Sequence, residues 1–237
     1  MRSVLLYNLF PVNHWQEVTQ SLLQNHHHDE LYIHITLPWW KKWFGNRAEK
    51  QIREFLTQYT TQDHIFCSTN QKKLGEVIGF NVFRQQIDFQ PFEMATYIHS
   101  KGVSRPENKN IADWTAMMGY FVLEKHAWCK EVFEKGKSLY GCNLNVVDNI
   151  DAKIPEVFRN TKFWFSGNFV SINLQKLHGA FLQTPCEPNY YGIERFWGRL
   201  CEADEAYCPF DSTPLVNHYD EPFPASRYVN APMPPID

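Results

Sequence analysis

The chain of 237 residues lacks several features that would each define a class of protein. Its six cysteines are scattered and contain no C-x-x-C pair, so the spacing indicates neither a zinc site nor a disulfide scaffold. No apolar run approaches the roughly 20 residues of a membrane span. The opening run is broken at Asn8 and Pro11, unlike the core of a signal peptide. We therefore expect a reduced, cytoplasmic protein, with peripheral attachment to a membrane left open.

An excess of charge of either sign is also missing. The net charge is −3, which gives no general attraction to nucleic acid or to anionic lipid, and no nucleic-acid partner is expected. Aromatic residues, by contrast, make up 16% of the chain, and hydrophobic residues 43%. A large aromatic core explains most of these rings, and rings near loops can stack on sugars or nucleotide bases. The totals indicate a globular protein with a full core.

The first hundred residues alternate between short apolar runs and helical periodicity. Strands are expected over residues 3–9, 30–36, 64–68 and 95–98, with a first helix that Asn13 can cap and further helices over residues 48–59 and 72–85. This order predicts an α/β fold with a mixed, mostly parallel sheet and helices on both faces.

The second half is expected to add a long helix, further strands and a tail. Asn110 is expected to cap a helix from residue 111 to about residue 135. Strands are predicted over residues 139–147 and 162–172, and helices over residues 173–182 and 193–200. Seven prolines follow Cys208. We predict one domain over residues 1–208 and a proline-rich tail over residues 209–237 that is packed on the surface or partly disordered.

A basic cluster follows the fourth expected strand. His99 and Ser100 are followed by Lys101, by Gly102, which lets the backbone turn, and then by Arg105. Cations at the carboxyl end of a buried strand can bind a diphosphate and neutralise its charge as it leaves. The alternative is a solvated loop that carries ordinary surface charges.

A carboxylate among rings is the second candidate. Glu194 precedes Phe196 and Trp197, and desolvation by aromatic neighbours can raise the pKa of a carboxyl enough for it to act as a general base. The alternative is an exposed helix residue paired with Arg195 or Arg199.

Three weaker features complete the candidates. In Ser166–Asn168, the glycine lets a ligand approach the backbone closely, and the asparagine amide can form hydrogen bonds with hydroxyls. A β-bulge in an aromatic strand is the alternative explanation of the same residues. Glu76 opens a helix where it could meet a sugar hydroxyl or simply favour the helix dipole. Asp148 and Asp151 could share a metal or belong to a turn.

Taken in order, several motifs resemble a known family. They are Leu6-Tyr7-Asn8, Tyr-x-His-Ser-Lys-Gly at 97–102, Asp113-Trp114, Gly141-Cys142-Asn143, Phe165-Ser166-Gly167-Asn168-Phe169 and Glu194-x-x-Trp197-Gly198. Over about residues 1–200, the chain resembles small bacterial and viral glycosyltransferase-like proteins with a GT-A type fold.

The resemblance implies a function and assigns roles to residues. It implies transfer of a sugar from a nucleotide-sugar donor to a glycan or glycolipid acceptor, with inversion, in surface glycan biosynthesis. Glu194 would be the catalytic base. The donor and its diphosphate would contact Tyr7, Asn8, Asn70, Glu76, His99, Lys101, Gly102 and Arg105. The acceptor would contact Asp113, Trp114, Ser166, Gly167, Asn168 and Trp197.

One departure from the family concerns the metal. Many enzymes of this fold carry Asp-x-Asp after the fourth strand, whereas this chain has no Asp-x-Asp and places His99–Lys101 there. Our hypothesis is that Lys101, helped by His99 or Arg105, replaces the charge of the metal. The alternative is a Mn²⁺ or Mg²⁺ ion bound by Asp148 and Asp151. Two other functions remain open: a non-catalytic protein that binds glycans or nucleotide sugars, and a nucleotide-sugar hydrolase.

Overall fold

The structure is a computed structural model that describes residues 1–38, 47–147, 156–158, 160–213 and 215–236. The strands are β1 (Ser3–Leu9), β2 (Glu30–Leu37), β3 (Ile65–Thr69), β4 (Met94–His99), β5 (Leu139–Gly141), β6 (Leu144–Val146), β7 (Phe163–Phe165), β8 (Val170–Asn173) and β9 (Ala206–Tyr207). The α-helices are α1 (Trp15–Leu23), α3 (Arg47–Leu56), α4 (Val77–Gln86), α5 (Lys109–Gly119), α6 (His126–Glu134), α7 (Leu174–Gln183) and α8 (Gly192–Trp197).

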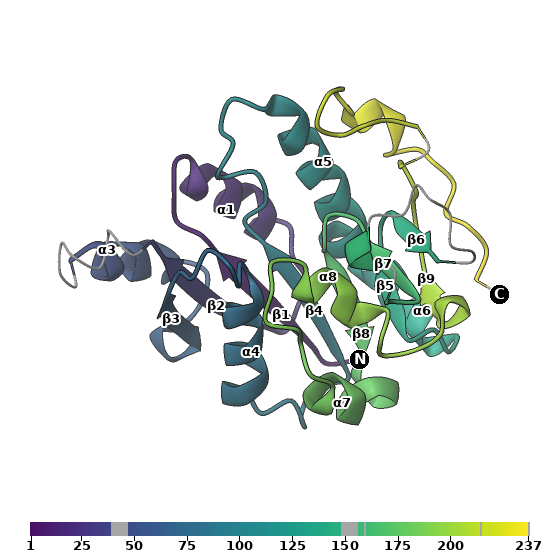
Figure 1. Cartoon of the computed structure of the whole chain (residues 1–237), viewed down its shortest axis with the longest axis horizontal. Helices are drawn as coiled ribbons and strands as arrows, with labels where there is room; N and C mark the ends of the chain where they lie inside the picture. Colours follow the sequence, from purple (N-terminus) through teal and green to yellow (C-terminus); the bar gives the residue numbers. More distant parts are fainter. Residues whose placement is uncertain (39–46, 148–155, 159, 214, 237) are drawn as a thin grey trace.

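Most of the strands belong to one mixed sheet. Its order is β3-β2-β1-β4-β8-β5-β9, and these strands are labelled in Figure 1. The first four strands are parallel neighbours, β8 is antiparallel to both β4 and β5, and β5 pairs in parallel with β9. Strands β6 and β7 form a separate antiparallel pair. The predicted α/β class with a mixed, mostly parallel sheet is confirmed.

Both faces of the sheet are buried because its strands carry apolar side chains on both faces. In β1, Leu5 and Tyr7 belong to a core that also contains residues of α1, α3, α5 and α6. The alternate residues Val4 and Leu6 belong to a second core with α4, α7 and α8. The prediction of helices on both faces is therefore confirmed. Within the described ranges, none of the helices has the length and apolar character needed to cross a membrane.

Several predicted helix ends are wrong by a few residues. Asn13 does not cap α1: it has a φ of 51°, and its side-chain nitrogen donates to the carbonyl oxygen of Val103 at 2.6 Å. The cap of α5 is Asn108, whose side chain accepts from the backbone N–H of Asn110 at 3.0 Å. Helix α4 starts at Val77, after a series of turns, rather than at residue 72.

The long helix and the two later strands are interrupted. A π-helical turn over Tyr120–Glu124 separates α5 from α6. The expected strand 139–147 divides into β5 and β6 around Asn143, and the expected strand 162–172 divides into β7 and β8 before Val170. Asn143 and Asn168 both have a left-handed backbone, with φ of 58° and 62°. Each break sends one half of the run into the main sheet and the other half into the β6–β7 pair.

The proline-rich tail lies along α5 (Figure 1). Phe223 and Tyr228 are buried in the same core as α5. The carboxylate of Asp113 accepts from the backbone N–H of Phe223 at 2.9 Å, and the hydroxyl of Tyr120 donates to the carbonyl oxygen of Val229 at 3.0 Å. The described part of the tail is therefore attached to the α5 side of the domain.

Candidate functional site

The strand order changes direction at β1. The chain proceeds outward from β1 to β2 and β3, and then returns to place β4 on the other side of β1. In open α/β sheets, ligands bind at the carboxyl ends of the strands beside such a reversal. A cavity of about 420 Å³ lies at this place. Its lining includes Asn8 and Phe10 from the end of β1, Thr36 from β2, Glu76 from before α4, and residues 99–105 from after β4.

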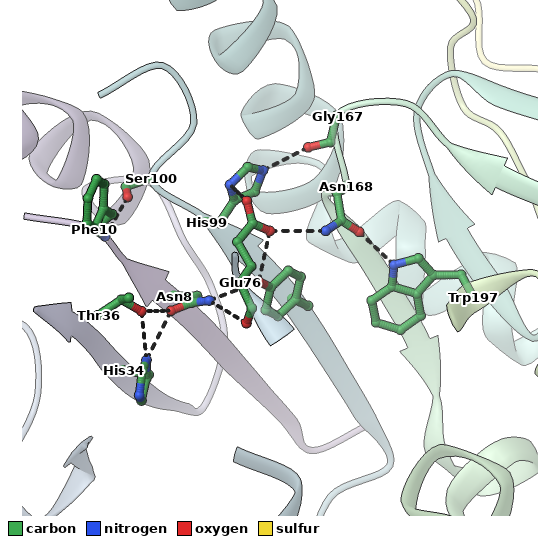
Figure 2. A network of polar contacts seen from close by, with 11 residues as sticks. Asn8, Phe10, His34, Thr36, Glu76, His99, Ser100, Gly167, Asn168 and Trp197 are labelled. Carbon is green, nitrogen blue, oxygen red and sulfur yellow. Dashed lines mark hydrogen bonds and ion pairs between the residues drawn. The ribbon is translucent and has the colours of Figure 1, made fainter. Parts of the chain in front are cut away.

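The carboxylate of Glu76 is the centre of a network of polar contacts in this cavity (Figure 2). One of its oxygens lies 2.6 Å from Nδ1 of His99. The other accepts from the Tyr97 hydroxyl at 3.2 Å and from the side-chain nitrogen of Asn168 at 3.3 Å. Burial pushes the pKa of Glu76 upward, but the contact with His99 and the charge of Lys101 hold that pKa below its usual value. Glu76 is thus an ionised acceptor whose oxygens are already engaged.

Below Glu76, the buried amide of Asn8 is fully hydrogen-bonded. Its nitrogen donates to the carbonyl oxygen of Glu76 at 3.0 Å and to the Tyr97 hydroxyl at 3.3 Å. Its oxygen accepts from the hydroxyl of Thr36 at 3.1 Å and lies 3.1 Å from Nδ1 of His34. Burial lowers the pKa of His34 to about 4, which keeps this ring neutral. The contacts of Asn8 fix the start of α4, and with it the position of Glu76.

The turn between β7 and β8 closes the network from the opposite side. Gly167 has a φ of 93°, and its carbonyl oxygen lies 3.1 Å from Nε2 of His99. Both ring nitrogens of His99 therefore face oxygen atoms, so the ring is held from two sides. The oxygen of the Asn168 side chain accepts from the indole N–H of Trp197 at 2.7 Å. Trp197 has no exposed surface, so it supports Asn168 from below and offers no face to a ligand.

Two cationic side chains from the loop after β4 line the cavity. The Nζ atom of Lys101 lies 3.9 Å from the centroid of the Trp114 ring. Burial lowers the pKa of Lys101, and the carboxylates of Glu194 and Glu76 act against that shift by stabilising its charge. The guanidinium of Arg105 lies 5.1 Å from the centroid of the Tyr219 ring. Positive charge is therefore gathered at the carboxyl end of β4.

Glu194, in the first turn of α8, has a strongly raised pKa and lies within electrostatic reach of three residues that line the cavity, Lys101, Glu76 and His99. Burial raises the pKa of Glu194, and the charge of Lys101 opposes this rise. The charge of Glu76 raises the pKa further and His99 lowers it, so that the resulting pKa is about 7. In contrast to Glu76, Glu194 makes no hydrogen bond or ion pair within the part of the chain that the structure describes. A carboxyl that titrates near neutral pH and has free oxygens is suited to accept a proton from a substrate.

The remaining candidates divide into those at the cavity and those elsewhere. Asn70 and Gly102 line the cavity. Tyr7 faces the other side of the sheet, where its hydroxyl lies 2.8 Å from that of Thr19. Asp113 is engaged with the tail. Ser166 and Trp114 instead line a shallower pocket beside tail residues. Asp148 and Asp151 lie outside the described residues.

The described residues around the carboxyl end of β4 do not form a site that fits a divalent cation. Within the described ranges, no three His, Cys, Asp or Glu side chains are grouped so that they could hold a metal ion. Glu76 is paired with His99, and Lys101 lies close enough to the carboxylates of Glu76 and Glu194 to lower the pKa of each. Hard divalent cations prefer several oxygen ligands and no ammonium group among them.

Sequence reasoning missed several residues of the cavity wall, among them Tyr190 and Tyr219. Tyr190 and Tyr219 both line it, and neither side chain is buried. The sequence held one indication of their role: both tyrosines lie in polar, proline-rich surroundings, where a buried position in the core was not expected.

Comparisons with known proteins give only distant likenesses. No protein-family model matches the chain, and no curated protein sequence matches it. Among solved structures, the chain is similar to TarS 1–349 from S. aureus, with a TM-score of 0.45 and 10% identity over 84% of this chain and 55% of that one. It is also similar to HddC from Yersinia pseudotuberculosis, with a TM-score of 0.38 and 8% identity over 82% of this chain and 84% of that one. The chain thus spans about half the length of the TarS fragment. With TM-scores below 0.5, these likenesses do not bear on the function.

Proposed function

We propose that the chain is an inverting glycosyltransferase that moves a sugar from a nucleotide-sugar donor to a glycan or glycolipid acceptor in surface glycan biosynthesis. One observation carries the proposal: Glu194, with a pKa of about 7 and free oxygens, lies within the electrostatic influence of Lys101, which lines the cavity over the strand-order reversal. A carboxyl poised to take a proton and a cation poised to receive an anion are the two groups that sugar transfer requires.

The reaction would be a single displacement. Glu194 accepts the proton of an acceptor hydroxyl, and the oxygen of that hydroxyl forms a bond to the anomeric carbon of the donor. The bond between that carbon and the diphosphate oxygen breaks at the same time, and the diphosphate leaves with the electron pair. Attack opposite the leaving group inverts the anomeric centre. Lys101 and Arg105 would neutralise the charge that develops on the diphosphate.

Glu76 would serve to position groups rather than to accept the proton. Its oxygens are held by His99, Tyr97 and Asn168, and its pKa lies below the usual value. An ionised group with these partners is a poor proton acceptor. We assign it the role of holding His99 and Asn168 at the floor of the cavity.

The experiment that tests the proposal separates binding from transfer. Thermal-shift measurements with a panel of nucleotide sugars, each in EDTA and in Mn²⁺, identify the donor, because a ligand that binds only the folded state stabilises it by about 2.7 kcal/mol at one hundred times its Kd. With that donor, products are analysed with and without a panel of oligosaccharide acceptors. We expect the melting temperature to rise with one donor and transfer to need an acceptor.

Glu194→Gln should retain the thermal shift with the donor and lose transfer. The matched control is Glu131→Gln, at an exposed helix position that pairs with Lys135 at 3.0 Å. Donor binding without transfer by the wild-type chain would indicate a non-catalytic binding protein. Release of free sugar at the same rate without acceptor would indicate a hydrolase.

A further inference from the structure

Two exposed aromatic side chains line the cavity and have no role in the proposed transfer reaction. Tyr190, which lies just before α8, is 68% exposed, and Tyr219, which belongs to the tail, is 44% exposed. Both line the cavity of about 420 Å³. Large aromatic side chains normally bury most of their surface, so an exposed pair at a cavity indicates a surface for a ligand.

Both rings are held in place without being covered. The Tyr219 ring meets Arg105 and packs edge-on against Trp114, with 5.6 Å between ring centroids. The backbone carbonyl oxygen of Tyr219 accepts a hydrogen bond from the side-chain nitrogen of Asn108 at 2.9 Å. The Tyr190 ring passes so close to Gly75 that a Cβ added there would lie 3.2 Å from it. The cost of ordering these side chains on binding is therefore small.

The same phenols lie within electrostatic reach of Glu194. Burial raises the pKa of the Tyr190 phenol, and the carboxylates of Glu76 and Glu194 raise it further. Burial also raises the pKa of the Tyr219 phenol; Arg105 opposes this shift and Glu194 adds to it. Both phenols thus keep their O–H at neutral pH and can donate hydrogen bonds to a ligand in the cavity.

We propose that Tyr190 and Tyr219 together form the binding surface for the acceptor sugar, a proposal that rests on the proposed function. A pyranose has an apolar C–H face that packs on an aromatic ring, and its hydroxyls can bond to the phenolic O–H groups. A sugar held against these rings presents a hydroxyl to Glu194. The base of the nucleotide is separated from the reacting carbon by the diphosphate, so it belongs further from Glu194, toward the ends of β1, β2 and β3.

The test uses the full chain and two probes. Binding to an array of immobilised oligosaccharides with varied pyranose units is measured in the presence of UDP or GDP, and the affinity for UDP and GDP is measured separately. The variants are Tyr190→Ala and Tyr219→Ala, with Tyr190→Phe and Tyr219→Phe keeping each ring. Thermal unfolding shows which variants are folded.

We expect each alanine variant to weaken oligosaccharide binding by about ten-fold, the order expected for one stacked ring, and to retain nucleotide affinity. The phenylalanine variants should lose less. The inference is overturned if wild-type protein binds no oligosaccharide, or if the alanine variants weaken UDP or GDP binding while oligosaccharide binding stays unchanged. Either result leaves the donor thermal shift intact, whereas loss of that shift in wild-type protein would overturn the proposed function itself.

Discussion

The indole N–H of Trp197 donates a 2.7 Å hydrogen bond to the side-chain oxygen of Asn168. An indole nitrogen can only donate, so this bond decides which way the amide points: its oxygen faces Trp197, and its nitrogen faces Glu76 at 3.3 Å. Glu76 in turn holds His99. A fully buried residue of α8 therefore sets the orientation of polar groups at the cavity floor (Figure 2).

Replacing Trp197 with phenylalanine tests this relationship. Trp197→Phe keeps most of the ring volume but leaves the buried oxygen of Asn168 without its donor, so we expect the free energy of unfolding to fall by about 1–3 kcal/mol in urea denaturation. The matched control is Trp164→Phe, because Trp164 stacks on Phe158 and its indole donates no hydrogen bond within the described residues. Equal losses in the two variants would mean that packing, and not the hydrogen bond, accounts for the effect.

Two helical glycines offer a matched pair for testing the Asn8 network. A Cβ at Gly79, in α4, would lie 2.5 Å from the side-chain oxygen of Asn8 and 2.5 Å from Nδ1 of His34. A Cβ at Gly179, in α7, would meet nothing within 4 Å. We expect Gly79→Ala to destabilise the protein by about 1–3 kcal/mol through overpacking. Gly179→Ala should stabilise it by about 0.5–1 kcal/mol through helix propensity. Calorimetry measures both, and a neutral Gly79→Ala would show that α4 shifts freely against β1.

The first half of the fold could be predicted because its signals are local. Strands such as β1 are short continuous apolar runs, and helices such as α3 repeat apolar residues every three or four positions, so each element is specified by its own sequence. The parallel arrangement of β1 to β4 then follows from the alternation of strands and helices. The carboxyl end of β4 could be selected as a candidate site for the same reason.

The helices α7 and α8 of the second half could be predicted to within a few residues, but its interruptions could not be, because they depend on single residues in tertiary context. Asn143 and Asn168 interrupt apolar runs that otherwise read as continuous strands, and the left-handed backbone of an asparagine leaves only a weak signal in sequence. The ion pair between Glu76 and His99 depends on where α4 starts relative to β4, which no local pattern encodes. The contribution of Tyr219 depends on where the tail returns to the domain.

Lys101 provides a test of metal-independent charge neutralisation. If Lys101 replaces the metal, turnover should be unchanged in EDTA, and Lys101→Met should weaken nucleotide-sugar binding and slow transfer. Because Lys101 lowers the pKa of Glu194, its removal should also move the activity profile to higher pH. Lys109→Met, at the start of α5, is the control. Loss of turnover in EDTA with recovery in Mn²⁺ would reject the idea and make Asp148 and Asp151 the candidate ligands.

Glu194 should make both activity and stability depend on pH near neutrality. As a base with a pKa of about 7, it should give a kcat/KM that falls about ten-fold for each pH unit below 7 and levels off above it. The folded pKa exceeds the ordinary glutamate value of 4.5, so the folded state holds this proton more tightly than the unfolded state does. The resulting stability is complete below pH 4.5 and is lost as the pH rises toward 7. Since each pKa unit corresponds to about 1.4 kcal/mol, Glu194→Gln should be more stable than wild type at pH 8, by at most about 3.5 kcal/mol.

The stability gain of Glu194→Gln should shrink at pH 5, where the wild-type carboxyl is protonated in the folded state. Urea denaturation at the two pH values measures the difference, and Glu131→Gln, at an exposed position, should show no comparable gain at pH 8. A stability gain of the same size at both pH values would mean that Glu194 is ionised throughout this range. The group that accepts the proton would then have to be sought elsewhere in the cavity.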